Sequence, residues 1–188
     1  MRGAQDGALK VSVTNDEVHL EGVDPAPSAL LAAIRRAVLG HKVVPVLCGS
    51  SLRNKGIQPL MDAVVAYLPS PLDIPPLVGT APDTGQPVEC RADPQGPTAA
   101  LAFKIATDPY MGRLTYFRVY SGTVRRGETL MNATNGQRER VGRLVRIHAD
   151  RREDIDGLSA GDIGAILGFR IAATGDTVCD ARSPVRLE

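Results

Sequence analysis

An alternating pattern of side chains over residues 98–122 most constrains the fold of this chain. Leu114, Tyr116, Arg118 and Tyr120 recur at every second position, which is typical of a strand with two different faces, and residues 99–105 alternate in the same way. Residues 108–112 between the two runs read Asp-Pro-Tyr-Met-Gly and predict a turn, because proline fixes φ and glycine permits a positive φ. We expect an antiparallel pair that needs further strands to be stable.

Short runs with strand character continue to the end of the chain. We expect strands at residues 128–133, 137–148, 155–158, 163–167 and 177–179, with turns at residues 134–136 and 159–162. Strands at this spacing, separated by glycine-containing turns, favour a small closed antiparallel β-barrel. The fold class predicted for residues 98–188 is therefore mainly β.

The first 68 residues follow a different pattern. Residues 10–21 predict a hairpin, and Leu30, Ile34 and Val38 have helical spacing that Gly40 ends. Residues 43–47 form an apolar run expected to be a buried strand of a parallel sheet, at its edge because Pro45 has no N–H. After a tight loop at residues 48–51, a second helix is expected at residues 57–68. This order is typical of an α/β domain.

Five prolines between residues 69 and 82 interrupt the α/β pattern. Such a run predicts a stiff, extended connector, and residues 80–97 resemble a surface loop because they are rich in proline, glycine and aspartate. We therefore expect three parts: an α/β part at residues 1–68, a connector and loop at residues 69–97, and the barrel at residues 98–188.

The sequence contains no recognisable catalytic or metal-binding pattern. Its net charge is +1, so any basic site must be local, and Cys48, Cys90 and Cys179 are expected to be reduced structural thiols. No phosphate-loop motif occurs, and the Asn-Lys-Gly-Ile segment at residues 54–57 lacks the aspartate of the guanine-reading motif. No signal peptide or membrane-length apolar run is present. Binding, rather than catalysis, is the expected activity.

Three blocks of the sequence resemble elongation factor G, the ribosomal translocation GTPase. They are LCGSSLRNKGIQPLMDAVVAYLPSP from residue 47, ALAFKIATDPYMGRLTYFRVYSG from residue 100, and AGDIGAILG with TGDTVCD after residue 159. The resemblance runs from about residue 20 to residue 188. It implies that Ser50, Ser51 and Leu52 form the last guanine-nucleotide motif, which contacts the base through its backbone. It also implies an α/β remnant of a P-loop GTPase domain, followed by the β-barrel domain II of translation factors.

The same resemblance implies a fragment of a cytoplasmic factor whose barrel docks on the small ribosomal subunit. GTP and Mg²⁺ belong to the full-length family, whereas this chain is expected to hold no cofactor and not to hydrolyse GTP by itself. Expected partners are the ribosome, small-subunit rRNA and the remaining domains of the parent protein, but no membrane. A mitochondrial-type ribosome-recycling homologue, a ribosome-protection GTPase and a stand-alone protein-interaction barrel stay open as alternatives. Residues 1–19 resemble nothing recognisable.

Arginines are concentrated in residues 137–148. Arg138, Arg140, Arg143 and Arg146 are expected on one strand, with Arg138, Arg140 and Arg146 on one face. Acidic residues at positions 139, 150, 153 and 154 would balance these charges if the face is merely solvated. The resemblance instead favours contacts with phosphates of ribosomal RNA. Arg118 either packs its stem against the barrel or also reaches RNA.

Overall fold

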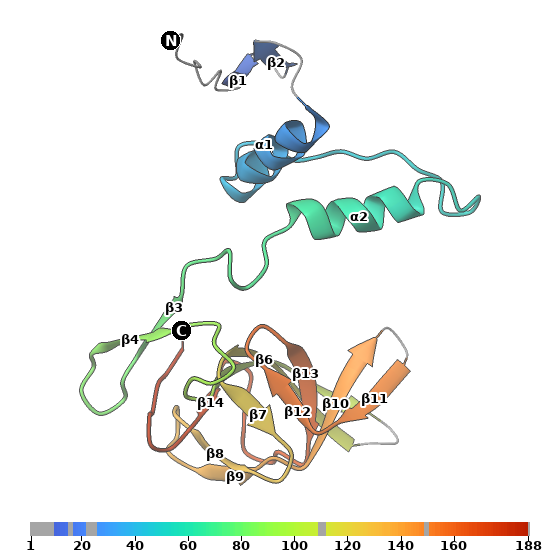
Figure 1. Cartoon of the computed structure of the whole chain (residues 1–188). Helices are drawn as coiled ribbons and strands as arrows, with labels where there is room; N and C mark the ends of the chain where they lie inside the picture. Colours follow the sequence, from blue (N-terminus) through green and yellow to red (C-terminus); the bar gives the residue numbers. More distant parts are fainter. Residues whose placement is uncertain (1–9, 15–16, 22–25, 109–111, 149–150, 188) are drawn as a thin grey trace. The chain divides into compact units, whose positions relative to one another are not determined.

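A computed structural model describes residues 10–14, 17–21, 26–108, 112–148 and 151–187 of the chain (Figure 1). The chain forms two compact units, Met1–Pro69 and Ser70–Glu188, called here the N-terminal unit and the β unit. Among the helices in the described ranges, none combines the length and apolar character that a membrane-spanning helix needs.

The N-terminal unit begins with the predicted hairpin. Strands β1 (Lys10–Thr14) and β2 (Glu17–Glu21) pair antiparallel, while residues 15–16 between them lie outside the described residues. Helix α1 (Pro27–Leu39) follows and ends where expected. Gly40 itself keeps a φ of −84°, and His41 takes the left-handed conformation, with a φ of 54°. The left-handed residue at the end of α1 is therefore His41 rather than Gly40.

The second helix of this unit, α2 (Ile57–Tyr67), confirms the predicted helix to within one residue. Arg35 of α1 donates from Nη1 to the carbonyl oxygen of Ala66 at 2.8 Å. A cation at this place satisfies a carbonyl of the last helical turn and opposes the negative end of the helix dipole. One side chain thus links the two helices.

The strand expected at residues 43–47 is absent from the structure. The segment is extended but not assigned as a strand, and the Val44 and Val46 side chains are 86% and 88% exposed. A strand of a parallel sheet needs a neighbouring strand, and no described residue of this unit pairs with the segment. Pro45 additionally removes one donor. The expectation of a buried edge strand is therefore wrong for this chain.

The β unit starts inside the stretch expected to be connector and loop. Strands β3 (Leu77–Thr80) and β4 (Pro87–Cys90) pair antiparallel, which corrects the loop expected at residues 80–97. Thr80 and Arg186 exchange two backbone hydrogen bonds, both of 2.8 Å. A buried cluster joins this hairpin to the C-terminal segment. It contains Cys90, Ala99, Cys179, Val185 and Leu187, and the partly buried Leu77 and Val88 pack against it.

Eight antiparallel strands form the main sheet of the β unit, in the order β11-β10-β13-β6-β5-β14-β8-β9. Their bounds are β5 (Ala99–Asp108), β6 (Gly112–Ser121), β8 (Thr129–Asn132), β9 (Arg138–Arg140), β10 (Arg143–His148), β11 (Arg151–Ile155), β13 (Ile163–Leu167) and β14 (Thr177–Cys179). A separate pair consists of β7 (Thr123–Arg125) and β12 (Gly157–Ser159). The antiparallel pair predicted within residues 98–122 is confirmed as β5 and β6. Most of the turn predicted at residues 108–112 lies outside the described residues, which exclude 109–111.

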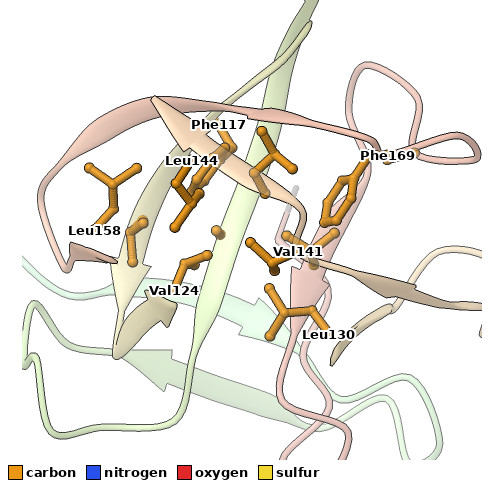
Figure 2. Packing of buried hydrophobic residues seen from close by; sticks show 12 residues of the cluster. Phe117, Val124, Leu130, Val141, Leu144, Leu158 and Phe169 are labelled. Atoms are coloured by element: carbon orange, nitrogen blue, oxygen red, sulfur yellow. The ribbon is translucent and has the colours of Figure 1, made fainter. Parts of the chain in front are cut away.

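The sheet and the β7–β12 pair surround one hydrophobic interior. Phe117, Val124, Leu144 and Leu158 come from four different strands and are at most 1% exposed. Figure 2 shows these side chains directed into a common interior, together with Leu130, Val141 and Phe169. Residues from both ends of the strand order meet there, so the sheet curls around its core. The expectation of a mainly β, antiparallel unit is confirmed.

Two details of the strand pattern differ from the expectation. The single strand expected at residues 137–148 is divided into β9 and β10 by Val141 and Gly142. A Cβ at Gly142 would lie 2.4 Å from the carbonyl oxygen of Leu167, so the chain can pass this corner only with glycine. Residues 151–155 form strand β11 against β10, although only residue 155 of this segment was expected to lie in a strand.

Candidate nucleotide loop and basic surface

Residues 48–56 of the N-terminal unit form a tight, closed loop. The amide of Ser50 donates to the carbonyl of Lys55 at 2.9 Å, and the amide of Lys55 donates back to Ser50 at 3.0 Å. Asn54 closes the turn by donating to Ser51 at 3.1 Å, with a φ of 50°. The loop is therefore closed by hydrogen bonds within its own backbone.

Two glycines allow the ends of this loop to approach each other. A Cβ at Gly49 would lie 2.9 Å from the carbonyl oxygen of Lys55, and one at Gly56 would lie 2.9 Å from that of Cys48. Gly56 also has a φ of 76°, a conformation that other residues rarely adopt. Because both positions are sterically closed to a side chain, the loop conformation depends on these glycines.

The tip of the loop presents residues Ser51, Leu52 and Arg53 to solvent, and Leu52 is 96% exposed. Among the backbone hydrogen bonds of the described residues, none uses the amides of these three residues as donors. Three successive free amides can donate to acceptor atoms of a nucleobase. The sequence contains no glycine-rich phosphate loop of the kind that cradles the phosphates of a nucleotide.

The arginines expected on one strand lie on two. Arg138 and Arg140 belong to β9, whereas Arg143 and Arg146 belong to β10, and the two strands lie toward opposite ends of the eight-strand order. The chain corner at Val141 and Gly142 separates them. The expected common face of Arg138, Arg140 and Arg146 is therefore wrong, because the alternation is reset at the corner.

Acidic neighbours compensate the two arginines of β10. The guanidinium of Arg143 forms a two-pronged ion pair with Asp154 of β11, in which Nη2 lies 2.6 Å from Oδ2. This contact lowers the pKa of Asp154 below its ordinary value. Arg146 lies 3.8 Å from a carboxylate oxygen of Asp162. The arginines of β10 therefore fit the interpretation of a solvated face on which acidic residues balance their charges.

Arg118 of β6 is packed along the surface of the β unit. Its guanidinium carbon lies 5.3 Å from the ring centre of Tyr120, within the range of a cation–π contact. Its Nε atom is buried and has no hydrogen-bond partner among the described residues. In this structure, Arg118 packs against the surface of the β unit, which is the first of its two expected roles. A role in RNA binding stays a prediction.

Comparison with known proteins agrees with the fold of the β unit. Residues 97–181, which carry all strands from β5 to β14, match the family described as Elongation factor G domain 2. These residues belong to the elongation factor G domain 2 family. An elongation factor G of Dehalococcoides mccartyi (strain ATCC BAA-2266 / KCTC 15142 / 195) is 54% identical over 172 residues, which is 92% of this chain and 25% of that protein. The chain thus spans a quarter of the relative's length.

A solved structure supports the fold of this elongation factor G homologue. A crystal structure of a protein from Thermus thermophilus superimposes with a TM-score of 0.61 and 23% identity, over 85% of this chain and 22% of that one. The match in sequence to elongation factor G covers more than the family's domain 2, because 172 aligned residues exceed the length of residues 97–181.

Sequence reasoning missed a buried carboxylate that orders one loop of this domain 2. Glu139 of β9 is only 8% exposed and accepts hydrogen bonds from three consecutive amides, those of Arg170, Ile171 and Ala172, at 2.6, 3.1 and 2.7 Å. Arg113 of β6 donates to the carbonyl oxygens of Arg170 and Ala172. No local signal indicates this contact, because its partners are separated by about thirty residues along the chain.

Proposed function

We propose that these 188 residues supply the end of the GTPase domain and domain 2 of an elongation factor G-like translation factor that acts on ribosomes in the cytoplasm. The observation that carries this proposal is 54% identity to an elongation factor G over 92% of the chain. The alignment is too long to be confined to the β unit, so it extends into the segment that precedes it. Residues 1–68 are then the closing part of a GTPase domain, and residues 98–188 are its neighbouring barrel.

Within this proposal, the loop of residues 48–56 contacts a guanine base in the complete factor. The motif was expected at Ser50, Ser51 and Leu52, and the amide of Ser50 is used within the loop. The free amides of Ser51 and Leu52, with that of the neighbouring Arg53, support such a role, because backbone N–H groups can donate to acceptor atoms of the base. GTP and Mg²⁺ would be held mainly by a phosphate loop, which the present sequence does not contain. Hydrolysis is accordingly not expected from these residues alone.

The β unit is proposed to dock on RNA of the small ribosomal subunit. Arginine contacts to RNA phosphates would make this affinity fall steeply with salt. The test is sedimentation of the whole chain with isolated small subunits over a salt series, with isolated large subunits as the control. Salt-sensitive, saturable co-sedimentation with small subunits is expected. Equal retention on both subunits at every salt concentration would contradict a specific docking role.

A further inference from the structure

The glutamates that neighbour the arginines at residues 125–126 and the arginines of β9 in sequence are engaged by the backbone. Glu128, which follows the Arg-Arg-Gly segment of residues 125–127, is half-buried and accepts the amide of Arg125 through Oε1 at 2.7 Å. Glu139, which stands between Arg138 and Arg140, is buried and accepts three amides. Both carboxylates therefore accept backbone N–H groups and form no ion pair with the adjacent arginines, although Glu128 still attracts the guanidinium of Arg125.

The arginines themselves remain on the surface and come together from two segments. Arg125 and Arg126 are exposed at the end of β7, and Arg138 and Arg140 are the exposed residues of β9, whose middle residue faces inward. Arg140 donates from Nε to the carbonyl of Gly127 at 3.2 Å, which holds it against the residue that follows Arg126. We call these four arginines the arginine corner.

Backbone contacts fix the two segments of the arginine corner together. The amide of Gly127 donates to Val141 and the amide of Val141 donates to Glu128, each at 2.8 Å. Arg140 stands opposite Thr129 in the β8–β9 ladder, and Arg138 stands opposite Met131. The corner is therefore a built arrangement of guanidinium groups on short, paired elements rather than a set of arginines on a long loop.

The charges of the arginine corner are less compensated than those of β10 and β11. Arg143, Arg146 and Arg152 form ion pairs with Asp154, Asp162 and Asp108, respectively. No residue of the corner forms an ion pair with any described residue. Among the acidic groups near it, Glu139 accepts three amides, and Glu128 accepts the amide of Arg125 and also attracts its guanidinium. Asp154 is held by Arg143 although Arg126 also acts on it, Asp156 accepts the amide of Arg126 through its carbonyl oxygen, and Asp180 lies 3.6 Å from Arg182.

We propose that the arginine corner, rather than the arginines of β10, is the RNA-phosphate-binding surface of the β unit. This inference rests on the proposed function and names the side chains that would carry it. Guanidinium groups fit phosphates because their N–H fork donates to two oxygens at once. An arginine already paired with a carboxylate contributes less free energy to phosphate binding, since its ion pair with the carboxylate must first be broken. Several guanidinium groups without a carboxylate partner on one rigid surface match the phosphate rows of an RNA helix, which is recognised by backbone and shape.

The test uses the whole chain and a short fluorescent RNA duplex of arbitrary sequence, with anisotropy measured over a salt series. The corner variant is Arg126→Ala/Arg138→Ala/Arg140→Ala. The matched control, Arg143→Ala/Arg146→Ala/Arg152→Ala, removes the same number of charges from paired positions. Each arginine–phosphate interaction that a substitution removes should flatten the plot of log affinity against log salt by about one unit. We expect a flattening of about two to three units in the corner variant and less than about one unit in the control.

Circular dichroism of each variant checks that the β unit is intact. If the loss of Arg140 disturbs the turn at Gly127, the double variant Arg126→Ala/Arg138→Ala replaces the triple one, with an expected flattening of about one to two units. Equal slopes in the corner variant and the control, or no duplex binding by the wild-type chain at low salt, would overturn the inference. Duplex binding through the corner without binding to small ribosomal subunits would contradict the proposed function while leaving this inference intact.

Discussion

Replacing Glu139 by alanine should destabilise the β unit by about 3 kcal/mol. Its carboxylate accepts three amides from residues 170–172, of which that of Ala172 is buried and the other two are partly buried. Leaving a buried N–H without a partner costs about 1–3 kcal/mol, and a partly buried N–H that regains water costs less, roughly 0.5–1 kcal/mol. One buried and two partly buried donors therefore sum to about 3 kcal/mol.

The glutamine variant provides a finer test of the same geometry. Oε2 of Glu139 receives the amides of Arg170 and Ile171, whereas Oε1 receives that of Ala172. A glutamine whose oxygen takes the Oε2 place keeps two of these hydrogen bonds but turns its own NH₂ group toward the Ala172 amide. We expect Glu139→Gln to cost about half as much as Glu139→Ala, because it loses one bond and the charge on the acceptor.

Urea unfolding followed by far-ultraviolet circular dichroism measures the change in the free energy of unfolding. Hydrogen exchange of the amides at residues 170–172 measures how much the substitution destabilises this loop locally. Glu153→Ala is the matched control, since Glu153 is exposed on β11 and such surface changes usually stay within about 0.5 kcal/mol. If Glu139→Ala unfolds within about 1 kcal/mol of the wild type and the three amides keep their protection, the carboxylate does not hold this loop.

Three further predictions use single assays. A thiol reagent should modify Cys48 at once but Cys90 and Cys179 only as the chain unfolds, because burial shields both thiols and raises the pKa of each; rapid loss of three thiols would contradict this. Arg143 holds the pKa of Asp154 below its ordinary value, so this pair contributes stability above that ordinary value and loses it as pH falls through the lowered pKa. Asp154→Asn should therefore weaken the acid dependence of unfolding slightly, and an unchanged acid limb would argue against the pair. A fluorescent GTP analogue should show no saturable micromolar binding, since the sequence contains no phosphate loop; a saturable titration would refute this.

Strands with one buried face were predictable from the sequence, and strands without one were not. Residues 100–103 of β5 alternate small and large side chains, and buried residues alternate with partly buried ones along most of β6, so the pairing of these strands could be expected from the order of the side chains. In contrast, β11 reads Arg-Arg-Glu-Asp-Ile, and its first four residues are exposed, so no hydrophobic period marks it. Residues 43–47 show the opposite case. Their side chains favour a strand, but they form none because no described segment pairs with them.

The direction of an acidic side chain limited what could be predicted about the basic surface. In sequence, Glu139 stands between two arginines and looks like their counterion. In the structure it faces inward to amides about thirty residues away, whereas Asp154 faces its arginine across a strand pair. These partners are too far apart along the chain to form a local sequence pattern. Counting charges in the sequence could therefore not distinguish arginines paired with a carboxylate from arginines without such a partner. The proposal that residues 50–52 contact guanine depended on resemblance alone.

The contact between Thr80 and Arg186 has a consequence for protein engineering. These two residues lie near the opposite ends of the β unit's sequence, yet their backbones are joined by two hydrogen bonds. A unit whose entry and exit points adjoin can be inserted into a surface loop of a host protein without forcing the host's strands apart. It can equally be joined end to end and reopened elsewhere, for instance at the exposed turn of Gly136. The β unit is therefore a candidate cassette for domain insertion and circular permutation.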